Sequence, residues 1–195
     1  INPWGMENWS RTTEHNVDLN RNFIDHNAPA PENKLYAELY PFICPPECTE
    51  KSIEAVQGQI GQLMQQYGQV TVTNSIAGCQ YDFSDGLNYG GDTPVWSNIT
   101  LHKIIKNHIA GAQKVGVVDW HTGMGGYGEA FFMCFHDEGS LAYERACSWW
   151  GGDNLQQKMD NDFGEDPPEY VGLLFQGLER ALGSAEVVGT VIEVG

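Results

Sequence analysis

The sequence is poor in basic residues. Ten Lys and Arg stand against 26 Asp and Glu, which gives a formal net charge of -16 at pH 7. A surface with this charge repels the phosphate backbone of nucleic acids and anionic lipid head groups. The sequence also has no apolar run that approaches the roughly 20 residues needed by a membrane-spanning helix. We therefore expect a soluble domain, cytoplasmic or secreted, without nucleic-acid or membrane partners.

The start of the sequence lacks the signals of a natural N-terminus. The opening residues contain no initiator Met, no basic segment and no apolar segment, and begin directly with Ile1-Asn2-Pro3-Trp4-Gly5. A secretory signal peptide would show a basic and then an apolar region. We interpret the sequence as a fragment or a processed chain.

The number of cysteines is odd. With five cysteines, at least one cannot form a disulfide within the chain. Cys44 and Cys48 flank a Pro-Pro turn, and either a small disulfide loop or two free thiols fits this spacing. A zinc finger is not favoured, because no second Cys or His pair follows at finger spacing.

The composition is that of a globular protein, with 41% hydrophobic and 11% aromatic residues. A chain of 195 residues is long enough for one α/β domain, or for most of one. Apolar periodicity predicts four helices. Three cover 50–67, 140–150 and 171–182, and the fourth begins after an N-cap at Ser97 and ends near Gly111. Apolar or β-branched runs predict strands over 70–73, 115–120, 131–135 and 187–194. Polar loops are expected over 1–35, 78–94 and 151–168. This alternation predicts an α/β fold with a mixed, mostly parallel sheet between helices.

Two of the four arginines lie in the opening polar loop. Arg11 and Arg21 are neighbours of Asn16, Asn20 and Asn22 in the sequence. Guanidinium groups pair bidentately with carboxylates, so the loop could bind an anionic ligand. The same arginines could instead form structural ion pairs with the acidic residues nearby, namely Glu7, Glu14, Asp18 and Asp25.

Two chemically competent residues each follow an apolar run. His121 comes directly after the strand predicted at 115–120 and before a glycine-rich stretch, which is where α/β sheets place ligand-binding groups. Glu193 follows the apolar run at 187–192 in the same way. His121 could be a metal ligand, a general base or a hydrogen-bonded structural residue. Glu193 could belong to a site or lie on the surface, since burying a lone carboxylate is costly.

Four ordered motifs resemble those of the zinc carboxypeptidases. The chain carries an Asn-Pro-x-Gly turn at Asn2, then Arg11, then an Asn-Arg pair within Asp18-Leu19-Asn20-Arg21-Asn22-Phe23. The stretches 80–91, 96–98 and 119–128 are similar to those of an uncharacterised carboxypeptidase-like subfamily, related to the succinylglutamate desuccinylase and aspartoacylase group. The resemblance covers essentially the whole chain. It implies a phosphorylase/hydrolase-like fold formed by a single domain over 1–195 that is truncated at its N-terminus.

The resemblance also implies roles for individual residues. His121 would be a zinc ligand, and Glu193 the general base that takes a proton from water. Arg11 would stabilise the oxyanion, while Asn20 and Arg21 would bind a free substrate carboxylate. The substrate-contacting tyrosine of the family has two candidates, Tyr127 and Tyr170.

One element of the family pattern is absent from the sequence. The first two zinc ligands of the family form a His-x-x-Glu motif upstream of the Asn-Pro turn, and no His-x-x-Glu occurs in these 195 residues. We expect the motif to lie before Ile1, or another chain or segment to supply it. The expected function is zinc-dependent hydrolysis of an amide bond next to a free carboxylate, by a metallocarboxypeptidase or an N-acyl-amino-acid deacylase. The alternative is a non-catalytic carboxypeptidase-like scaffold used as a binding or structural module.

Overall fold

The structure is a computed structural model that describes residues 2–123, 125–151 and 170–195. Its internal contacts divide the chain into two units, and each is treated by itself. The first unit comprises Ile1–Lys103 and Pro168–Gly177, and the second comprises Ile104–Pro167 and Leu178–Gly195. No helix within the described ranges is long and apolar enough to cross a bilayer.

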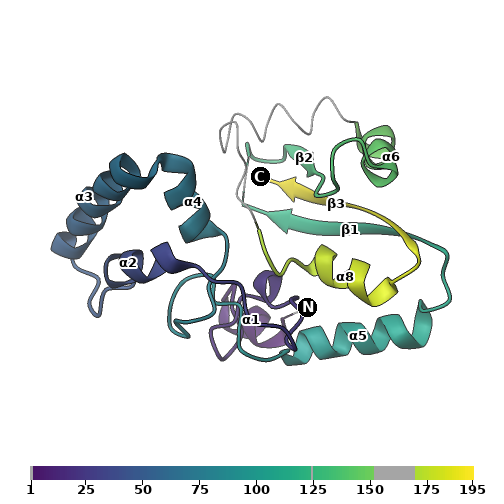
Figure 1. Cartoon of the computed structure of the whole chain (residues 1–195), viewed down its shortest axis with the longest axis horizontal. Coiled ribbons are helices and arrows are strands. Elements are labelled where there is room, and N and C mark those ends of the chain that lie inside the picture. Colours follow the sequence, from purple (N-terminus) through teal and green to yellow (C-terminus); the bar gives the residue numbers. More distant parts are fainter. Residues whose placement is uncertain (1, 124, 152–169) are drawn as a thin grey trace. The chain divides into compact units, whose positions relative to one another are not determined.

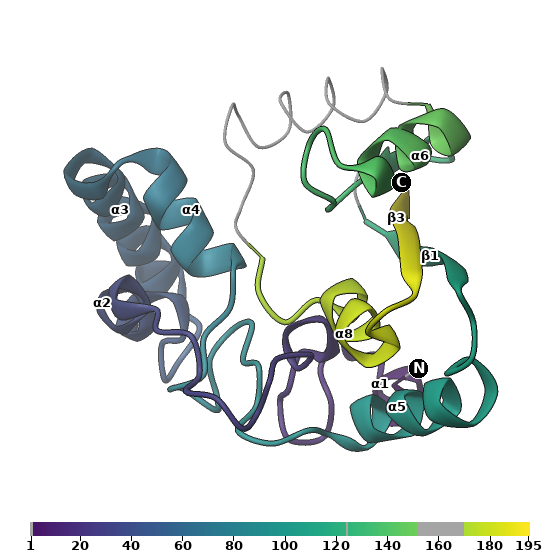
Figure 2. The same cartoon turned by 45° about the vertical axis from the view of Figure 1, so that its right-hand side comes forward.

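Three helices of the first unit pack against one another: α2 (Lys34–Ile43), α3 (Glu50–Tyr67) and α4 (Gln69–Ala77). Figures 1 and 2 show them as one helical group. Leu39, Leu63 and Val72, one from each helix, form the buried centre of this group. The start of α3 is fixed by a capping box between Thr49 and Ser52, and its end by Gly68. The helix predicted over 50–67 is confirmed.

Two expectations for this region need correction. The strand predicted over 70–73 is wrong, because these residues lie within α4. Val72 is fully buried against α2 and α3, and this packing outweighs the β preference of a Val-Thr-Val-Thr run. Helix α2 was not predicted. Its signals are the Asn33 cap and the apolar spacing of Tyr36, Leu39 and Ile43, which Pro41 in the last turn obscures.

The opening polar region contains two short elements, α1 (Pro3–Asn8) and a 3-10 helix, η1 (Leu19–Arg21), within the loop expected over 1–35. Asn22 is fully buried and ties this loop to the chain before α5 (Trp96–His108). Its side-chain amide donates to the carbonyls of Gly90 and Thr93, at 2.7 and 2.9 Å. Its carboxamide oxygen accepts from the Val95 N–H at 3.0 Å. Because α5 begins at Trp96, Ser97 lies in its first turn and is not the N-cap that was predicted.

The second unit contains a three-stranded sheet in the order β1-β3-β2 (Figure 1), formed by β1 (Lys114–Thr122), β3 (Glu186–Val194) and β2 (Ala130–Met133). β1 runs parallel to β3, and β2 runs antiparallel to it. The central strand β3 is buried at all its inner positions, as expected for a strand that is covered on both faces. The strands predicted over 115–120, 131–135 and 187–194 are confirmed with small shifts of their ends. The α/β class and the mixed sheet are confirmed as well, with one parallel and one antiparallel pair in place of a mostly parallel sheet.

Two helices complete the described fold. α6 (Leu141–Trp150), capped by Ser140, packs against β3. α8 (Leu174–Leu182) confirms the helix predicted over 171–182, although it starts three residues later. The polar loop predicted over 151–168 lies outside the described residues beyond Gly151. All five cysteines are described and carry free thiols, so Cys44 and Cys48 are not joined.

A candidate active site at the ends of paired strands

The strongest candidate for a reactive centre is a histidine–carboxylate pair at the ends of β1 and β3. His121 and Glu193 occupy paired positions in the parallel ladder. Residues in register on neighbouring parallel strands point to the same face of a sheet. The two side chains therefore meet, with Nδ1 of His121 3.8 Å from Oε1 of Glu193. The structure brings together the two residues that the sequence predicted separately.

Asp119 holds the imidazole ring from the opposite side. It lies two residues before His121, hence on the same face of β1, and its Oδ2 is 3.1 Å from Nε2 of His121. A carboxylate can only accept, so Nε2 of His121 is the donor in this contact, and Nδ1 is the ring nitrogen that faces Glu193. Histidines that bind metals usually donate their other ring N–H to a carboxylate in this manner. The Asp-x-His spacing on a strand is the signal that sequence reasoning passed over.

Glu193 is buried, with 5% of its surface exposed. The surface location considered for this residue is therefore wrong. On its other side, the register pairs Glu193 with Phe131 of β2, which is also buried. A carboxylate in so apolar a setting requires a cation or hydrogen-bond donors nearby. The imidazole of His121 is one such neighbour, with Nδ1 3.8 Å from Oε1 of Glu193.

The glycine-rich turn after β1 is tied to the end of β3. Thr122 Oγ1 donates to the Val194 carbonyl at 2.8 Å, and the Gly128 N–H donates to the Gly195 carbonyl at 2.7 Å. Tyr127 lies in this turn with its side chain fully exposed. The turn thereby fixes the strand ends that carry His121 and Glu193.

A separate group of predicted residues lies in the first unit, around η1. Arg11 donates from Nε to Oδ2 of Asp18 at 2.9 Å, so it forms the ion pair considered as the structural alternative. Asp18 is buried and also accepts from the Asn20 N–H at 3.0 Å. The Arg11 side chain remains 64% exposed, which leaves part of its guanidinium accessible to a ligand.

Arg21 is buried and engaged with the backbone. Nη1 donates to the Asn20 carbonyl at 2.7 Å, and Nη2 donates to the Ala77 carbonyl at 2.8 Å. Burial lowers the pKa of the guanidinium, and the nearby Asp18 carboxylate opposes this lowering. The Asn20 carboxamide oxygen accepts from the Leu174 N–H at 2.8 Å. Carboxylate binding by Asn20 and Arg21 stays a prediction.

The two candidate tyrosines differ in their surroundings. Tyr170 lies against Arg21, whose guanidinium carbon is 4.8 Å from the ring centroid. Tyr127 is exposed and belongs to the other unit. Of the two, Tyr170 therefore contacts a residue predicted to bind substrate.

The described residues supply at most part of a metal site. In the part of the chain that the structure describes, no group of three or more His, Cys, Asp or Glu side chains is arranged to hold a metal ion. His121 fits the role of one ligand, because Asp119 accepts from Nε2 and orients the ring, as the carboxylate partners of metal-binding histidines do. A catalytic zinc has three protein ligands, so two further ones are needed.

The fold and these residues define an α/β protein with a histidine–carboxylate pair at its strand ends. The chain belongs to the family described as "Protein of unknown function (DUF2817)", whose model matches residues 1–195. A search of curated proteins and a search of solved structures each found no match.

Proposed function

We propose that the chain is part of a zinc-dependent hydrolase that cleaves an amide bond next to a free carboxylate. The observation that carries the proposal is the pairing of His121 with Glu193, in register on parallel strands and 3.8 Å apart. A metal ligand and a general base must both reach the same water, and the short distance within this pair supports such an arrangement. The resemblance of the four sequence motifs to zinc carboxypeptidases supports the same assignment.

Each residue has a distinct task in this proposal. Zinc, when bound, lowers the pKa of water to about 7 and polarises the substrate carbonyl. Glu193 accepts the proton of the attacking water and passes it to the leaving amine. Asp119, which lies 3.1 Å from Nε2, would hold the His121 ring in the tautomer whose Nδ1 can bind the metal. The resemblance assigns to Arg11, whose side chain is partly exposed, the stabilisation of the negative charge that would develop on the carbonyl oxygen.

The remaining zinc ligands would come from outside residues 1–195. The resemblance assigns them to a His-x-x-Glu motif before Ile1, and a segment of the same protein or another chain would provide it. Asn20 and Arg21 would recognise the free carboxylate, with Tyr170 beside them. A peptide C-terminus and the carboxylate of an acyl-amino acid both satisfy this recognition, so carboxypeptidase and deacylase are both retained.

A non-catalytic scaffold is the second candidate, and two contacts favour it. Arg11 is paired with Asp18, and the terminal nitrogens of Arg21 donate to backbone carbonyls. In this reading both arginines stabilise the loop around η1 and bind no substrate. Such a scaffold would bind a partner through its surface and would have no catalytic activity.

The test is an assay of the protein as it occurs naturally. Its intact mass and zinc content are measured together with hydrolysis of N-acetyl-amino acids and of peptides with a free C-terminus. The same peptides with an amidated C-terminus serve as the control. The proposal predicts a chain heavier than 21.6 kDa, or a complex, with one zinc and with hydrolysis of free-carboxylate substrates only. A metal-free protein of about that mass without hydrolysis would support the scaffold.

A further inference from the structure

A groove of the first unit is lined by none of the residues to which a catalytic or substrate-binding role was assigned above. It consists of two hollows of about 540 and 550 Å³ that share the residues Glu14, His15, Thr93 and Val95. The first hollow is flanked by Trp4 and Trp96, with Pro3 and Pro94 beside them. The second contains Asp85 and Asp92. All these residues belong to the first unit.

The aromatic end of the groove is held rigidly. Trp4 lies in the first turn of α1, where the Asn2 side chain accepts from the Gly5 N–H at 3.0 Å and donates to the Thr12 carbonyl at 2.9 Å. A Cβ on Gly5 would collide with Asn2 and with the Ser10 carbonyl, so only glycine fits this turn. The backbone that carries Trp4 therefore does not have to be ordered when a ligand arrives.

The backbone at Trp96 is fixed by an independent set of bonds at the start of α5. The preceding Val95 donates its N–H to Asn22 Oδ1 at 3.0 Å, and Asn98 donates to the Asn22 carbonyl at 2.9 Å. Asn22 is fully buried, so this anchor is shielded from water. Trp96 is nevertheless 62% exposed, which leaves an indole surface open to a ligand.

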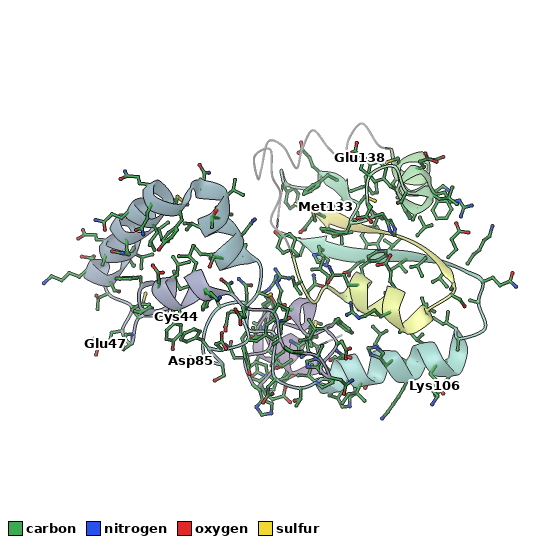
Figure 3. All side chains as sticks on the ribbon, in the orientation of Figure 1. Cys44, Glu47, Asp85, Lys106, Met133 and Glu138 are labelled. Carbon is green, nitrogen blue, oxygen red and sulfur yellow. The ribbon has the colours of Figure 1, made fainter. Side chains whose placement is uncertain are left out.

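The other part of the groove is acidic. Asp85 and Asp92 line the second hollow, Glu14 lies where the two hollows meet, and no Lys or Arg is among the described residues that form either hollow. Figure 3 labels Asp85 on the loop between α4 and α5. Its Oδ1 accepts from the Tyr40 hydroxyl at 2.7 Å, which holds the carboxylate in place while it stays exposed.

Aromatic faces beside carboxylates are complementary to one class of ligand. Tryptophan is the best partner for an organic cation in a cation–π contact, and its ring also packs against an alkyl chain. Carboxylates at the far end attract the charged head of the same side chain. A phosphate, an acidic peptide or a lipid head group would be repelled, in line with the net charge of -16.

We propose that this groove binds a cationic segment of a partner polypeptide, in which Lys or Arg side chains alternate with apolar residues. The alkyl stems and apolar side chains lie on Trp4 and Trp96. The ammonium or guanidinium groups reach Glu14, Asp85 and Asp92. This binding requires neither zinc nor a free carboxylate, so it does not depend on the proposed hydrolase activity.

The probe is a fluorescein-labelled hexapeptide of alternating Lys and Leu with an amidated C-terminus, titrated with the full chain by fluorescence anisotropy. Amidation removes the carboxylate that Arg21 is proposed to bind. Two peptides with Ser or Glu in place of Lys are measured in parallel. We expect saturable 1:1 binding of the Lys peptide that weakens with added salt, and at least tenfold weaker binding of the other two.

Matched variants separate the groove from the general acidity of the protein. Glu14→Gln and Trp96→Ala should each weaken the Lys peptide by about three- to fivefold, the range for partly exposed charge and cation–π contacts. Glu7→Gln and Trp9→Ala change the same residue types at exposed positions outside the groove and should leave the affinity within about 1.5-fold.

Three results would overturn the proposal. If the groove variants and their controls lost the same affinity for the Lys peptide, the binding would be non-specific attraction to an acidic surface. Equal binding of the Ser peptide would make the groove an apolar surface without preference for cations. Self-association that Trp96→Ala abolishes, measured by sedimentation, would assign the groove to a second copy of the chain.

Discussion

The guanidinium of Arg21 lies over the ring of Tyr170, with its carbon atom 4.8 Å from the ring centroid. Its terminal nitrogens donate to the Asn20 and Ala77 carbonyls. Arg21 thus connects η1, the end of α4 and the chain before α8.

We predict that Arg21→Ala lowers the free energy of unfolding by roughly 2–4 kcal/mol, because the buried side chain is lost and two partly buried carbonyls lose their donors. Urea unfolding followed by circular dichroism measures this loss. The matched variant Arg180→Ala, at an exposed position of α8, should change the free energy by less than about 1 kcal/mol, the upper range for an exposed charge contact. Equal stability of both variants would show that the Arg21 contacts contribute nothing.

The two arginines of the opening loop should differ in kinetics. In a zinc-containing parent, Arg21→Lys should mainly raise KM, because a substrate carboxylate is present in both the ground state and the transition state. Arg11→Ala should mainly lower kcat, because the oxyanion exists only during the reaction. Steady-state kinetics with one free-carboxylate substrate separates the two effects. The reverse pattern would exchange the two roles, and small equal effects would leave only the structural contacts.

Gly172 should be intolerant of a side chain. It has a φ of +75°, and a Cβ there would collide with the Arg21 carbonyl. Its own carbonyl accepts from the Phe23 N–H at 3.0 Å, so the chain cannot move away without losing a bond. Gly183 has a φ of +57° but open space around its Cβ position, which makes it the matched control.

We expect Gly183→Ala to lower the free energy of unfolding by about 1 kcal/mol, because alanine is strained in the left-handed backbone. Gly172→Ala should lower it by at least about 2 kcal/mol more, because its Cβ also collides with the Arg21 carbonyl. The free energy of unfolding of both variants gives the comparison. Similar costs at the two sites would mean that the loop before α8 does not pack on η1 as closely as the structure shows.

His136 should make the second unit sensitive to acid. Gly189 donates its N–H to Nε2 of His136 at 3.0 Å, which requires Nε2 to be unprotonated. Burial lowers the pKa of His136, with Asp137 opposing, and Glu179 lies 3.5 Å from Nδ1. A pKa lowered in the folded state gives stability that is complete above about 6.5, the ordinary pKa of histidine, and is lost as the pH falls.

We predict that the wild type loses about 1 kcal/mol of unfolding free energy between pH 7.5 and 5.5 through this residue, the value of one hydrogen bond. His136→Gln keeps an acceptor that does not titrate, so its stability should change less over the same range. His108→Gln, at an exposed position of α5, should follow the wild type. Identical pH profiles for His136→Gln and the wild type would contradict the assignment.

Sequence reasoning identified His121 and Glu193 because each follows an apolar run, and such runs form the strands of a buried sheet. It could not give their pairing, which depends on strand order and register. The contacts of Arg21 could not be predicted either, because one of its partners, Ala77, lies 56 positions further along the chain. The β-branched run at 70–73 was assigned to a strand, since only the packing of Val72 against α2 and α3 decides for a helix.

The pairing of His121 with Glu193 as metal ligand and base is the central claim, and zinc content measured beside turnover tests it most directly. In a zinc-containing parent, Glu193→Gln should keep the metal and lose at least about a hundredfold in kcat, since only the base is removed. His121→Ala should lose both metal and activity. Glu129→Gln, beside the glycine-rich turn, is the matched control and should keep both. Near-normal turnover of Glu193→Gln, with Glu129→Gln inactive, would contradict the claim and move the base to Glu129.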